Sequence, residues 1–273
     1  MTSLSVHPTT ALVKTLFRPY INSSRVHLER FVQRAASSVP RGSLILDAGA
    51  GESTPYRHLF RQHRYESADI SGNVTYKCDI SSLPVENDRF DLVVSTQLLE
   101  HVPNPQAVIC ELFRILKPSR QLWLTTPLFY EEHLQPYDFF RYTRFGLRRI
   151  FESAGFCVEE ITELEGYCGT LAYQLEVASR SLPRRPASYG RGLPAFLGAA
   201  LGTTLRPACA ILARVYSHLD VQNKVIGAGQ CKNYCVIAMK PVDRSLRGCA
   251  TEVFNLSSGE SNVAHTRPVS NVE

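Results

Sequence analysis

The sequence predicts a three-layer α/β sandwich with a mainly parallel sheet, and three observations carry that prediction. Short apolar runs of strand length alternate with stretches of helical period through most of the 273 residues. The run "SLILDAGAG" is mostly apolar up to its glycines, which is typical of a strand covered on both faces. The hydrophobic fraction of 44% is enough to bury one substantial core.

Seven segments have the length and composition of strands. In chain order they are "SLILDAG", "YESADI", "VTYKCDI", "FDLVVS", "QLWLTTP", "CVEEITEL" and "NYCVIAMK". Two stretches between them, "NPQAVICELFRILKP" and "RFGLRRIFESAGF", have helical period and are expected to end at Pro118 and Gly155. This alternation predicts helices on both faces of the sheet.

The other segments predict additions to this core. Residues 1–42 read as an N-terminal helical segment, because apolar residues recur there at helical spacing. Residues 43–240 form the main domain, and within it 166–232 are too long for a hairpin connection, so we expect a helical insert. The polar composition of residues 241–273 predicts a disordered tail.

Composition and charge exclude several classes of protein. The net charge of +5 is mild and no long basic run occurs, so we expect no nucleic-acid partner. The N-terminus, "MTSLSVHPTTALVKTLF", lacks the pattern of a signal peptide, which predicts a cytoplasmic chain. Eight scattered cysteines fit a reduced compartment, and the Cys231–Cys235 pair has no second pair beside it, so no metal is expected.

Acidic residues follow three of the predicted strands. Asp47 precedes a glycine turn, Asp69 lies roughly 20 residues downstream of that turn, and Asp79 ends the third strand. Ligands of a parallel sheet bind outside the carboxyl ends of its strands. One such acid is unremarkable, but three beside a glycine pair suit a nucleoside, with a carboxylate accepting the ribose hydroxyls.

The glycine pattern narrows the kind of nucleoside. A dinucleotide fingerprint needs a third glycine, and Thr54 stands in its place. No Gly-Lys-Ser/Thr sequence follows the turn, so a P-loop is excluded. The pattern therefore favours an adenosine without a pyrophosphate, and S-adenosylmethionine combines an adenosine with an ammonium group. Asp47 could reach that ammonium through water, or it could hold amides of the loop.

These motifs together resemble those of the class I S-adenosylmethionine-dependent methyltransferases over residues 44–165. "LILDAGAG" is similar to their motif I, and "SADIS" is similar to their ribose-binding turn. "FDLVV", "LLEHV" and "LKP" resemble the type 11, or ubiquinone-biosynthesis-like, branch. The resemblance implies a Rossmann-like sheet of seven strands, the last antiparallel, and S-adenosyl-L-methionine as the cofactor.

The resemblance also implies roles for individual residues around the cofactor. The methionine part would be bordered by Asp47, Gly49, Ala50 and Gly51. The adenosine would be bound by four residues, with Asp69 on the ribose, Asp79 on the adenine amino group, and Ile70 and Ile80 against the ring. Ser95 and Thr96 would face the reacting methyl group.

The segment "HLQPYDFFRYT" follows the fifth strand and should cover the acceptor pocket. His133 could remove a proton from an acceptor oxygen, with Asp138 orienting its imidazole or binding a substrate hydroxyl. Arg141 could bind a carboxylate or phosphate, and Tyr142 could stack on a sugar or apolar chain. In the alternative interpretation these residues form a polar network that pins a lid. His101 is the second candidate base, or a residue that only positions the start of a helix.

The sequence thus predicts a methyltransferase acting on a small-molecule, glycan or lipid-linked acceptor, with oxygen favoured. The alternatives are a C-methyltransferase of quinone type and a non-catalytic cofactor-binding subunit. Residues 193–205 are uncharged and arginines flank them. The segment 193–216 is therefore either a helical cap packed on the domain or a peripheral contact with the inner face of a membrane.

Overall fold

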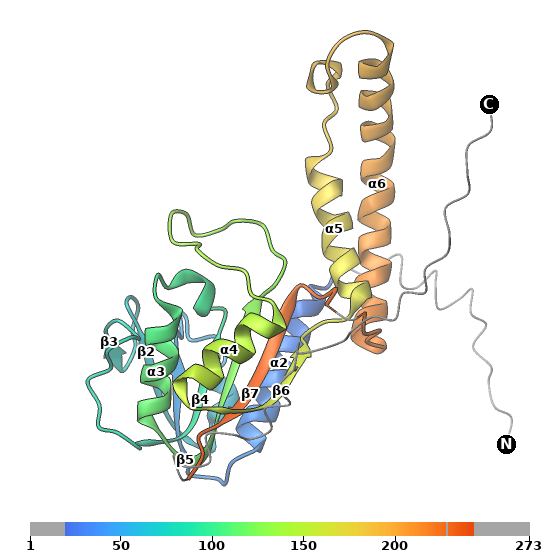
Figure 1. The fold of residues 1–273 in the computed structure, drawn as a ribbon. Coiled ribbons are helices and arrows are strands. Elements are labelled where there is room, and N and C mark those ends of the chain that lie inside the picture. The colour runs from blue at the N-terminus through green and yellow to red at the C-terminus, as the bar shows by residue number, and fades with distance from the viewer. Residues whose placement is uncertain (1–19, 228, 243–273) are drawn as a thin grey trace, which may run out of the picture.

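The computed structural model describes residues 20–227 and 229–242, and its centre is one sheet of seven strands in the order β3-β2-β1-β4-β5-β7-β6 (Figure 1). All pairings among the first five strands are parallel, and β7 is antiparallel to both β5 and β6. The Rossmann-like sheet with an antiparallel last strand is confirmed. The strands are β1 (Leu44–Ala48), β2 (Arg64–Asp69), β3 (Tyr76–Lys77), β4 (Phe90–Thr96), β5 (Leu116–Pro127), β6 (Cys157–Glu163) and β7 (Asn233–Met239).

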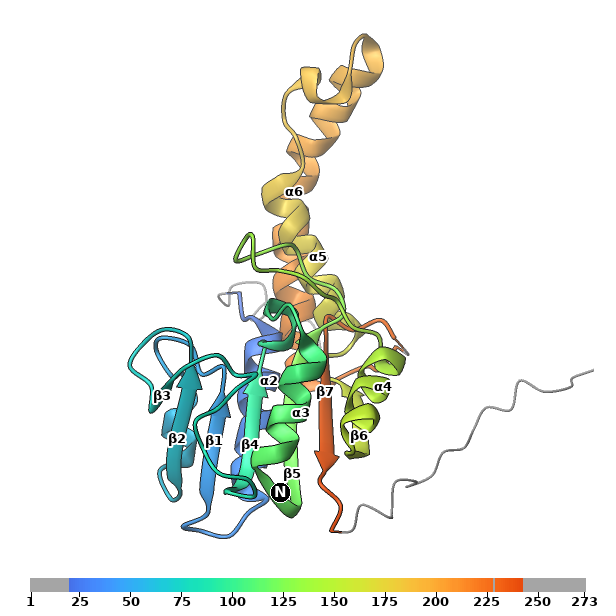
Figure 2. The ribbon, with the colours of Figure 1, turned by 60° about the vertical axis from the view of Figure 1, so that its left-hand side comes forward.

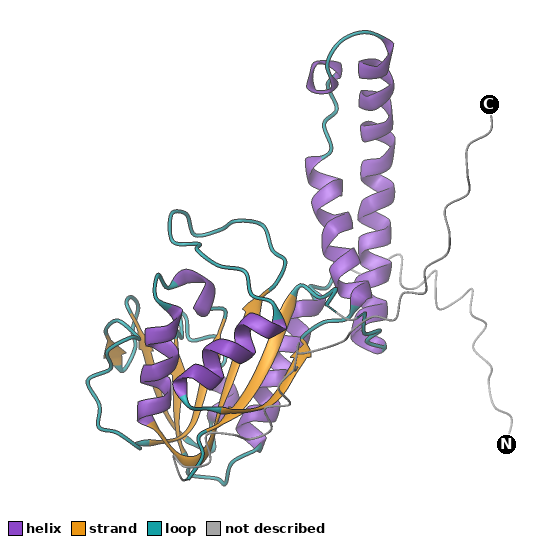
Figure 3. Ribbon diagram, in the orientation of Figure 1, coloured by secondary structure: helices purple, strands orange, loops and turns teal. Residues whose placement is uncertain are grey.

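Helices cover both faces of this sheet, which gives the three layers visible in Figure 3. Helix α2 (Ser23–Ser37) packs on one face through Phe31, Val32 and Ala35. Helices α3 (Pro105–Ile115) and α4 (Arg144–Ala154) pack on the other. Helix α3 ends three residues before Pro118, where we expected its end, because the chain turns into β5 at Leu116.

Side chains of each central strand alternate between two cores. Leu46 and Val93 face α3 and α4, whereas Ile45 and Leu92 face α2. Burying a leucine or isoleucine side chain is worth roughly 1.5–3 kcal/mol, so both faces contribute strongly to folding. Double coverage explains why the sequence of β1 does not alternate between apolar and polar residues.

The segment between β6 and β7 forms a helical hairpin, as expected of an insert. It consists of α5 (Tyr167–Ser181), the short 3-10 turn η3 (Pro186–Tyr189) and α6 (Leu193–Gln222). The two helices pack against each other and project away from the sheet (Figure 1). The expectation of a cap packed on the domain does not hold, because the contact of α6 with α2 is confined to its base.

A buried carboxylate fixes the base of the hairpin. Asp220 accepts a hydrogen bond from the Gly166 amide (2.9 Å) and lies 3.1 Å from Nε2 of His27 in α2. Gly169 is needed beside it, because a Cβ there would overlap the Asp220 carboxylate. In Figure 2 the hairpin extends from the end of the sheet toward which β1, β2 and β4 run. The hairpin and the carboxyl ends of these strands therefore face the same way.

Candidate cofactor and acceptor site

The glycine turn after β1 leaves backbone atoms open at the edge of the sheet. Gly49 (φ +77°) and Gly51 (φ +66°) adopt left-handed conformations that other residues rarely tolerate. A Cβ on Gly49 would come within 2.9 Å of Leu98, whereas a Cβ on Gly51 would meet no atom of the described residues within 4 Å. Ala50 between them is buried. Gly51 thus borders open space, as close approach of a cofactor requires.

Asp47, at the end of β1, is buried and only half satisfied. Its Oδ2 accepts a hydrogen bond from the Tyr65 hydroxyl (2.7 Å), but within the described chain its Oδ1 is buried and has no hydrogen-bond partner. Burial raises the pKa of Asp47 to about 6, although the Tyr65 hydrogen bond opposes the rise. An orphaned buried carboxylate oxygen is costly, so the site fits a ligand carrying an ammonium group.

Asp69 and Ile70 lie beside the glycine turn at the end of β2. The Asp69 carboxylate accepts hydrogen bonds from the amides of Gly51 (2.9 Å) and Ser71 (3.0 Å), which fixes its orientation. The Ser71 hydroxyl also donates to Oδ1 (3.4 Å), whereas Oδ2 retains a lone pair that could accept from a ribose hydroxyl. Ile70 is 74% exposed, so a large apolar surface is open where the adenine is expected.

Asp79 and Ile80 follow β3 and differ in accessibility. Asp79 is exposed and accepts a hydrogen bond from the Ser81 amide (2.8 Å), an arrangement that holds the carboxylate in a tight turn. Ile80 is only 3% exposed and packs in the core beneath the site. Ile70, rather than Ile80, therefore offers the open apolar surface.

Ser95 and Thr96 end β4, the strand next to β1. Ser95 is fully buried, and its Oγ has no hydrogen-bond partner among the described residues. Thr96 is half-buried. The ends of two neighbouring strands thus each carry an orphaned polar atom, which fits the polar methionine end of S-adenosylmethionine better than an apolar ligand.

The segment 128–143, here called the acceptor loop, joins β5 to α4 and covers the end of β4. Its main chain is tied down where the Phe139 amide donates to the Glu100 carbonyl (2.8 Å). The Tyr142 hydroxyl donates to the Leu99 carbonyl (2.9 Å), and the ring is buried. The position of Tyr142 thus favours a packing role over the predicted stacking on an acceptor. Exposed aromatic rings elsewhere in the loop are Phe129, Tyr137, Phe139 and Phe140.

A two-pronged ion pair stiffens the acceptor loop. Nη1 and Nη2 of Arg141 lie 2.6 and 2.8 Å from the two carboxylate oxygens of Asp138. Hydrogen bonds from Arg141 hold the pKa of the Asp138 carboxyl well below its usual range. Arg141 also donates to the Tyr130 carbonyl (3.2 Å). The pair therefore matches the alternative interpretation, a polar network that pins a lid. Asp138 occupies the two guanidinium nitrogens of Arg141 that we predicted would bind a carboxylate or phosphate of the acceptor.

Two histidines meet at this point, His101 from the 3-10 turn η2 (Leu99–His101) and His133 from the acceptor loop. Their rings are in edge-to-face contact, with centroids 4.6 Å apart. Nδ1 of His101 lies 2.6 Å from the Tyr137 carbonyl oxygen, and Nδ1 of His133 lies 3.1 Å from the Glu131 carbonyl oxygen. A carbonyl only accepts, so each Nδ1 carries the proton and each Nε2 can accept one.

Asp138 affects the position of the His133 ring, and burial affects the pKa of His101. The backbone amide of His133 donates to Asp138 (2.8 Å), whose carboxylate also lies 3.3 Å from Nδ1 of the ring. Burial lowers the pKa of His101, so this ring is neutral near pH 7. Asp138 thus positions His133, as one of the predicted roles requires.

Glu100, to which the sequence alone gave a structural role, is a further residue of this candidate site. Its carboxyl is fully buried, accepts a hydrogen bond from Thr126 (3.2 Å) and lies 3.8 Å from Nε2 of His101. Burial raises its pKa to about 7, where it can exchange a proton with the imidazole. Ligand atoms of Glu100, His101 and His133 lie within 4.8 Å of one another, so the cluster could also hold a divalent cation. The adjacent Glu-His pair in "LLEHV" was the available signal.

A group missed by the sequence reasoning links the acceptor loop to the hairpin. The rings of Tyr130 and Tyr173 stack with centroids 5.2 Å apart, and Nζ of Lys232 lies 5.1 and 4.6 Å from them. Burial lowers the pKa of Lys232. These residues come from three separate segments, so spacing along the chain gave no hint of their contact.

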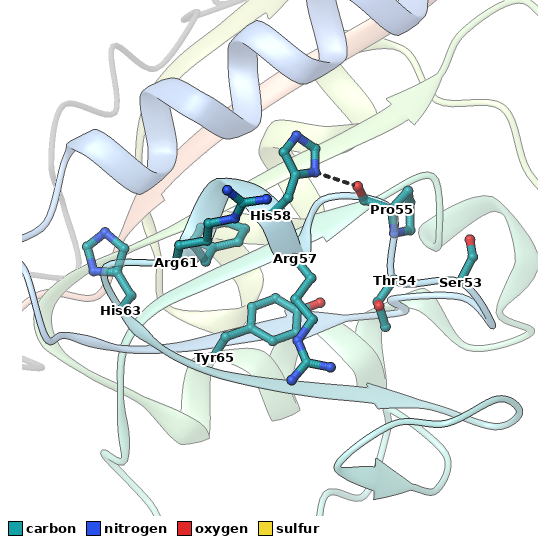
Figure 4. Close-up of a pocket in the computed structure, with 9 residues that line it drawn as sticks. Ser53, Thr54, Pro55, Arg57, His58, Arg61, His63 and Tyr65 are labelled. Carbon is teal, nitrogen blue, oxygen red and sulfur yellow. Dashed lines mark hydrogen bonds between the residues drawn. The ribbon is translucent and has the colours of Figure 1, made fainter.

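A separate basic hollow is lined by the segment that follows the glycine turn in the sequence (Figure 4). Its volume is about 590 Å³, and its lining comes from residues 53–65, including the 3-10 turn η1 (Arg57–Phe60). Arg57 and Arg61 contribute its positive charge, and His58 and His63 also line it. The lining contains none of the predicted site residues, so the hollow is distinct from the predicted site.

Comparison with known proteins assigns the family. A family model described as a methyltransferase domain matches residues 20–161, which is more than half of the chain. The chain therefore belongs to the class I S-adenosylmethionine-dependent methyltransferases, as the motifs and the fold indicate. The predictions of an enzyme and of its cofactor are confirmed, and the alternative of a non-catalytic subunit loses its support.

Individual relatives are distant. A ubiquinone biosynthesis O-methyltransferase of Coxiella burnetii (strain RSA 493 / Nine Mile phase I) is 40% identical over 55 residues, which are 20% of this chain and 24% of the relative. The chain thus matches only about a quarter of that protein. Two solved structures share the fold with TM-scores of 0.50, the [4+2]-cyclase SpnF (18% identity, 79% and 81% of the two chains) and a geranyl diphosphate C-methyltransferase from Streptomyces coelicolor A3(2) (14%, 79% and 80%).

Proposed function

We propose that this methyltransferase transfers its methyl group to an oxygen atom of a small-molecule, glycan or lipid-linked acceptor. The observation that carries the proposal is the contact between His101 and His133, each with an Nε2 able to accept a proton. A hydroxyl becomes a good nucleophile only when its proton is removed, and a base with a pKa near the working pH does this best.

Each residue of the cluster has a distinct role in this proposal. Nε2 of His133 takes the proton of the acceptor hydroxyl, while the Glu131 carbonyl and Asp138 hold the opposite edge of the ring. His101 packs against that ring, and Glu100 can exchange a proton with Nε2 of His101. The bound cofactor supplies a methyl group on a positive sulfur, which needs no further activation, so alignment of the acceptor is the protein's other main task.

The cofactor contacts are part of the same proposal. Asp47, Gly49, Ala50 and Gly51 would border the methionine part, with Ser95 and Thr96 near the methyl group. The positions of Asp69, Ile70 and Asp79 around the turn support their assignment to the ribose and the adenine. Arg141 and Tyr142 would shape the acceptor pocket through the loop rather than by direct contact.

A labelled-methyl experiment tests the reaction. The purified chain is incubated with ¹³C-methyl cofactor and fractionated cell extract, and NMR of the product shows whether the label lies on oxygen or carbon. We expect an O-methyl product. A C-methyl product would refute the proposal and support the quinone-type alternative.

Variants test the proton acceptor. We expect His133→Gln to lower kcat by on the order of 100-fold or more, while affinity for S-adenosylhomocysteine stays unchanged. His58→Gln, an exposed histidine outside the cluster, is the matched control. Full turnover by both His133→Gln and His101→Gln would show that the base lies elsewhere.

The location of the chain belongs to the proposal as well. We infer a cytoplasmic protein that contacts the inner face of a membrane peripherally. Helix α6 has the length and composition of a membrane-crossing helix, and only 17% of its most apolar window is buried. An acceptor embedded in or attached to that membrane would then lie near the acceptor loop.

A further inference from the structure

One face of the hairpin exposes a row of large apolar side chains along α6. Most of them are three, four or seven residues from another member, so together they cover one half of the helix circumference. Their exposed fractions range from 40% to 71%. The members of this outward face are Leu193, Phe196, Leu197, Leu201, Leu205, Ile211 and Leu212.

The outward face is not needed for packing within the hairpin. The opposite side of α6 presents the small residues Ala195, Ala199 and Gly202, which are buried. Tyr189 closes against Gly198, and the space beside Gly202 is filled by the Pro183 carbonyl. The helices thus pack closely through small residues, and the large apolar side chains remain for another partner.

The charge around this face has one sign. Between Glu176 and Asp220 the chain contains six arginines and no acidic residue. Arg206 is used internally, since its guanidinium donates to the carbonyls of Ser179 (2.7 Å) and Leu182 (3.0 Å). Exposed arginines at the turn of the hairpin are Arg184, Arg185 and Arg191.

We propose that the outward face of α6 docks on the surface of an anionic phospholipid bilayer. An exposed apolar face flanked by arginines is the composition of helices that lie in the headgroup region, with apolar side chains toward the acyl chains. The arginines at the turn argue against a spanning hairpin, because they would have to cross the apolar centre of the bilayer. A second copy of this chain is a poorer partner for the outward face. Two such surfaces carry arginines and no acidic residues, so they would repel each other.

The placement of the hairpin gives this docking a consequence for the enzyme. It extends from the same end of the domain as the cofactor turn (Figure 2) and is bonded to the acceptor loop through Glu131, whose carboxylate lies 2.6 Å from Arg180. Docking would therefore hold the acceptor loop near the bilayer. The inference rests on the peripheral membrane contact proposed above, for which it names the surface and the lipid class, and it is independent of the proposed oxygen chemistry because it concerns a surface outside the site.

Co-sedimentation of the full chain with vesicles tests the proposal. The vesicles contain equal parts of phosphatidylcholine and phosphatidylglycerol, and pure phosphatidylcholine vesicles serve for comparison. We expect binding to the anionic vesicles that is weaker on pure phosphatidylcholine and falls as salt is added. Absence of binding to the anionic vesicles would overturn the proposal.

Two triple variants separate the apolar and charged contributions. Leu193→Ser/Leu197→Ser/Leu201→Ser and Arg184→Gln/Arg185→Gln/Arg191→Gln should each lower the bound fraction by about tenfold or more. Phe145→Ser, which removes a 77% exposed ring on α4, should leave binding unchanged. All variants should bind S-adenosylhomocysteine as the wild type does, which shows that the domain is folded.

Two outcomes of these measurements would refute bilayer docking. One is binding retained by both triple variants. The other is a dimer, seen by analytical ultracentrifugation without lipid, that the leucine variant dissociates, because the face would then serve self-association. Loss of methyl transfer with intact vesicle binding would bear on the proposed oxygen chemistry alone.

Discussion

The buried Glu100 carboxyl makes stability depend on pH in a way that one substitution can isolate. Its pKa is raised from 4.5 to about 7 by burial, so the folded protein holds a proton there that the unfolded chain releases earlier. Stability contributed by a raised pKa is complete below pH 4.5 and is lost as pH rises through 7. The difference between the two pKa values corresponds to about 3 kcal/mol of unfolding free energy.

The substitution Glu100→Gln removes the ionisation and keeps the size of the side chain. We expect the variant to be more stable than the wild type at pH 8 by about 3 kcal/mol and to differ little at pH 5. Asp47, with a pKa raised to about 6, contributes its own pH dependence to both proteins, so only the difference in unfolding free energy between the variant and the wild type is informative. Urea unfolding of the two cofactor-free proteins at pH 5 and pH 8 measures this difference.

An exposed carboxylate on α4 provides the control for the buried Glu100. Glu152→Gln changes an exposed carboxylate on α4 that pairs with Arg148, and such surface pairs are worth little, so its difference from the wild type should be small at both pH values. If Glu100→Gln and the wild type lose the same free energy between pH 5 and pH 8, Glu100 does not hold a proton in the folded state. Its place in the proton relay would then be refuted.

Three further predictions concern the site. Asp69→Ala should weaken S-adenosylhomocysteine binding by on the order of 10-fold or more in calorimetry, because charge-assisted bonds to the ribose are lost; unchanged affinity would refute the ribose assignment. Arg141→Lys should lower kcat but not cofactor affinity, because the two-pronged bond to Asp138 that stiffens the acceptor loop is broken. Turnover should survive EDTA, because the proposed relay moves a proton; loss of rate restored by a divalent cation would assign Glu100, His101 and His133 to a metal instead.

The fold was largely predictable because its signals are local. All seven strands were recognisable as short segments with the length and composition of strands, and double coverage of the sheet explains why residues 44–48 are buried throughout. The left-handed Gly49 and Gly51 could be expected from their place after a strand. The projection of α6 away from the sheet could not be predicted. An apolar helix that packs on a domain and one that projects from it have the same spacing of apolar residues.

The cofactor part of the candidate site could be proposed from the sequence because its residues follow the ends of strands. Asp69 and its neighbours are read from the sequence because the ends of parallel strands converge on one edge. The contact of His101 with His133, by contrast, joins residues from η2 and the acceptor loop, and only the fold brings them together. The role of Glu100 depends on complete burial, which a single acidic residue in a helical turn does not reveal.

The acceptor loop and the hairpin behave as one structural unit, since several bonds cross between them. The Glu131 amide donates to the Tyr173 hydroxyl (3.1 Å), and the Tyr130 ring stacks on Tyr173. The Tyr130 ring also makes an edge-to-face contact with His133, at 5.0 Å between centroids. A continuous path of packed side chains thus runs from α5 to the proposed base. We therefore expect a partner that orders the hairpin to restrict the position of His133, and a double-mutant cycle between Tyr173→Phe and His133→Gln would measure that coupling.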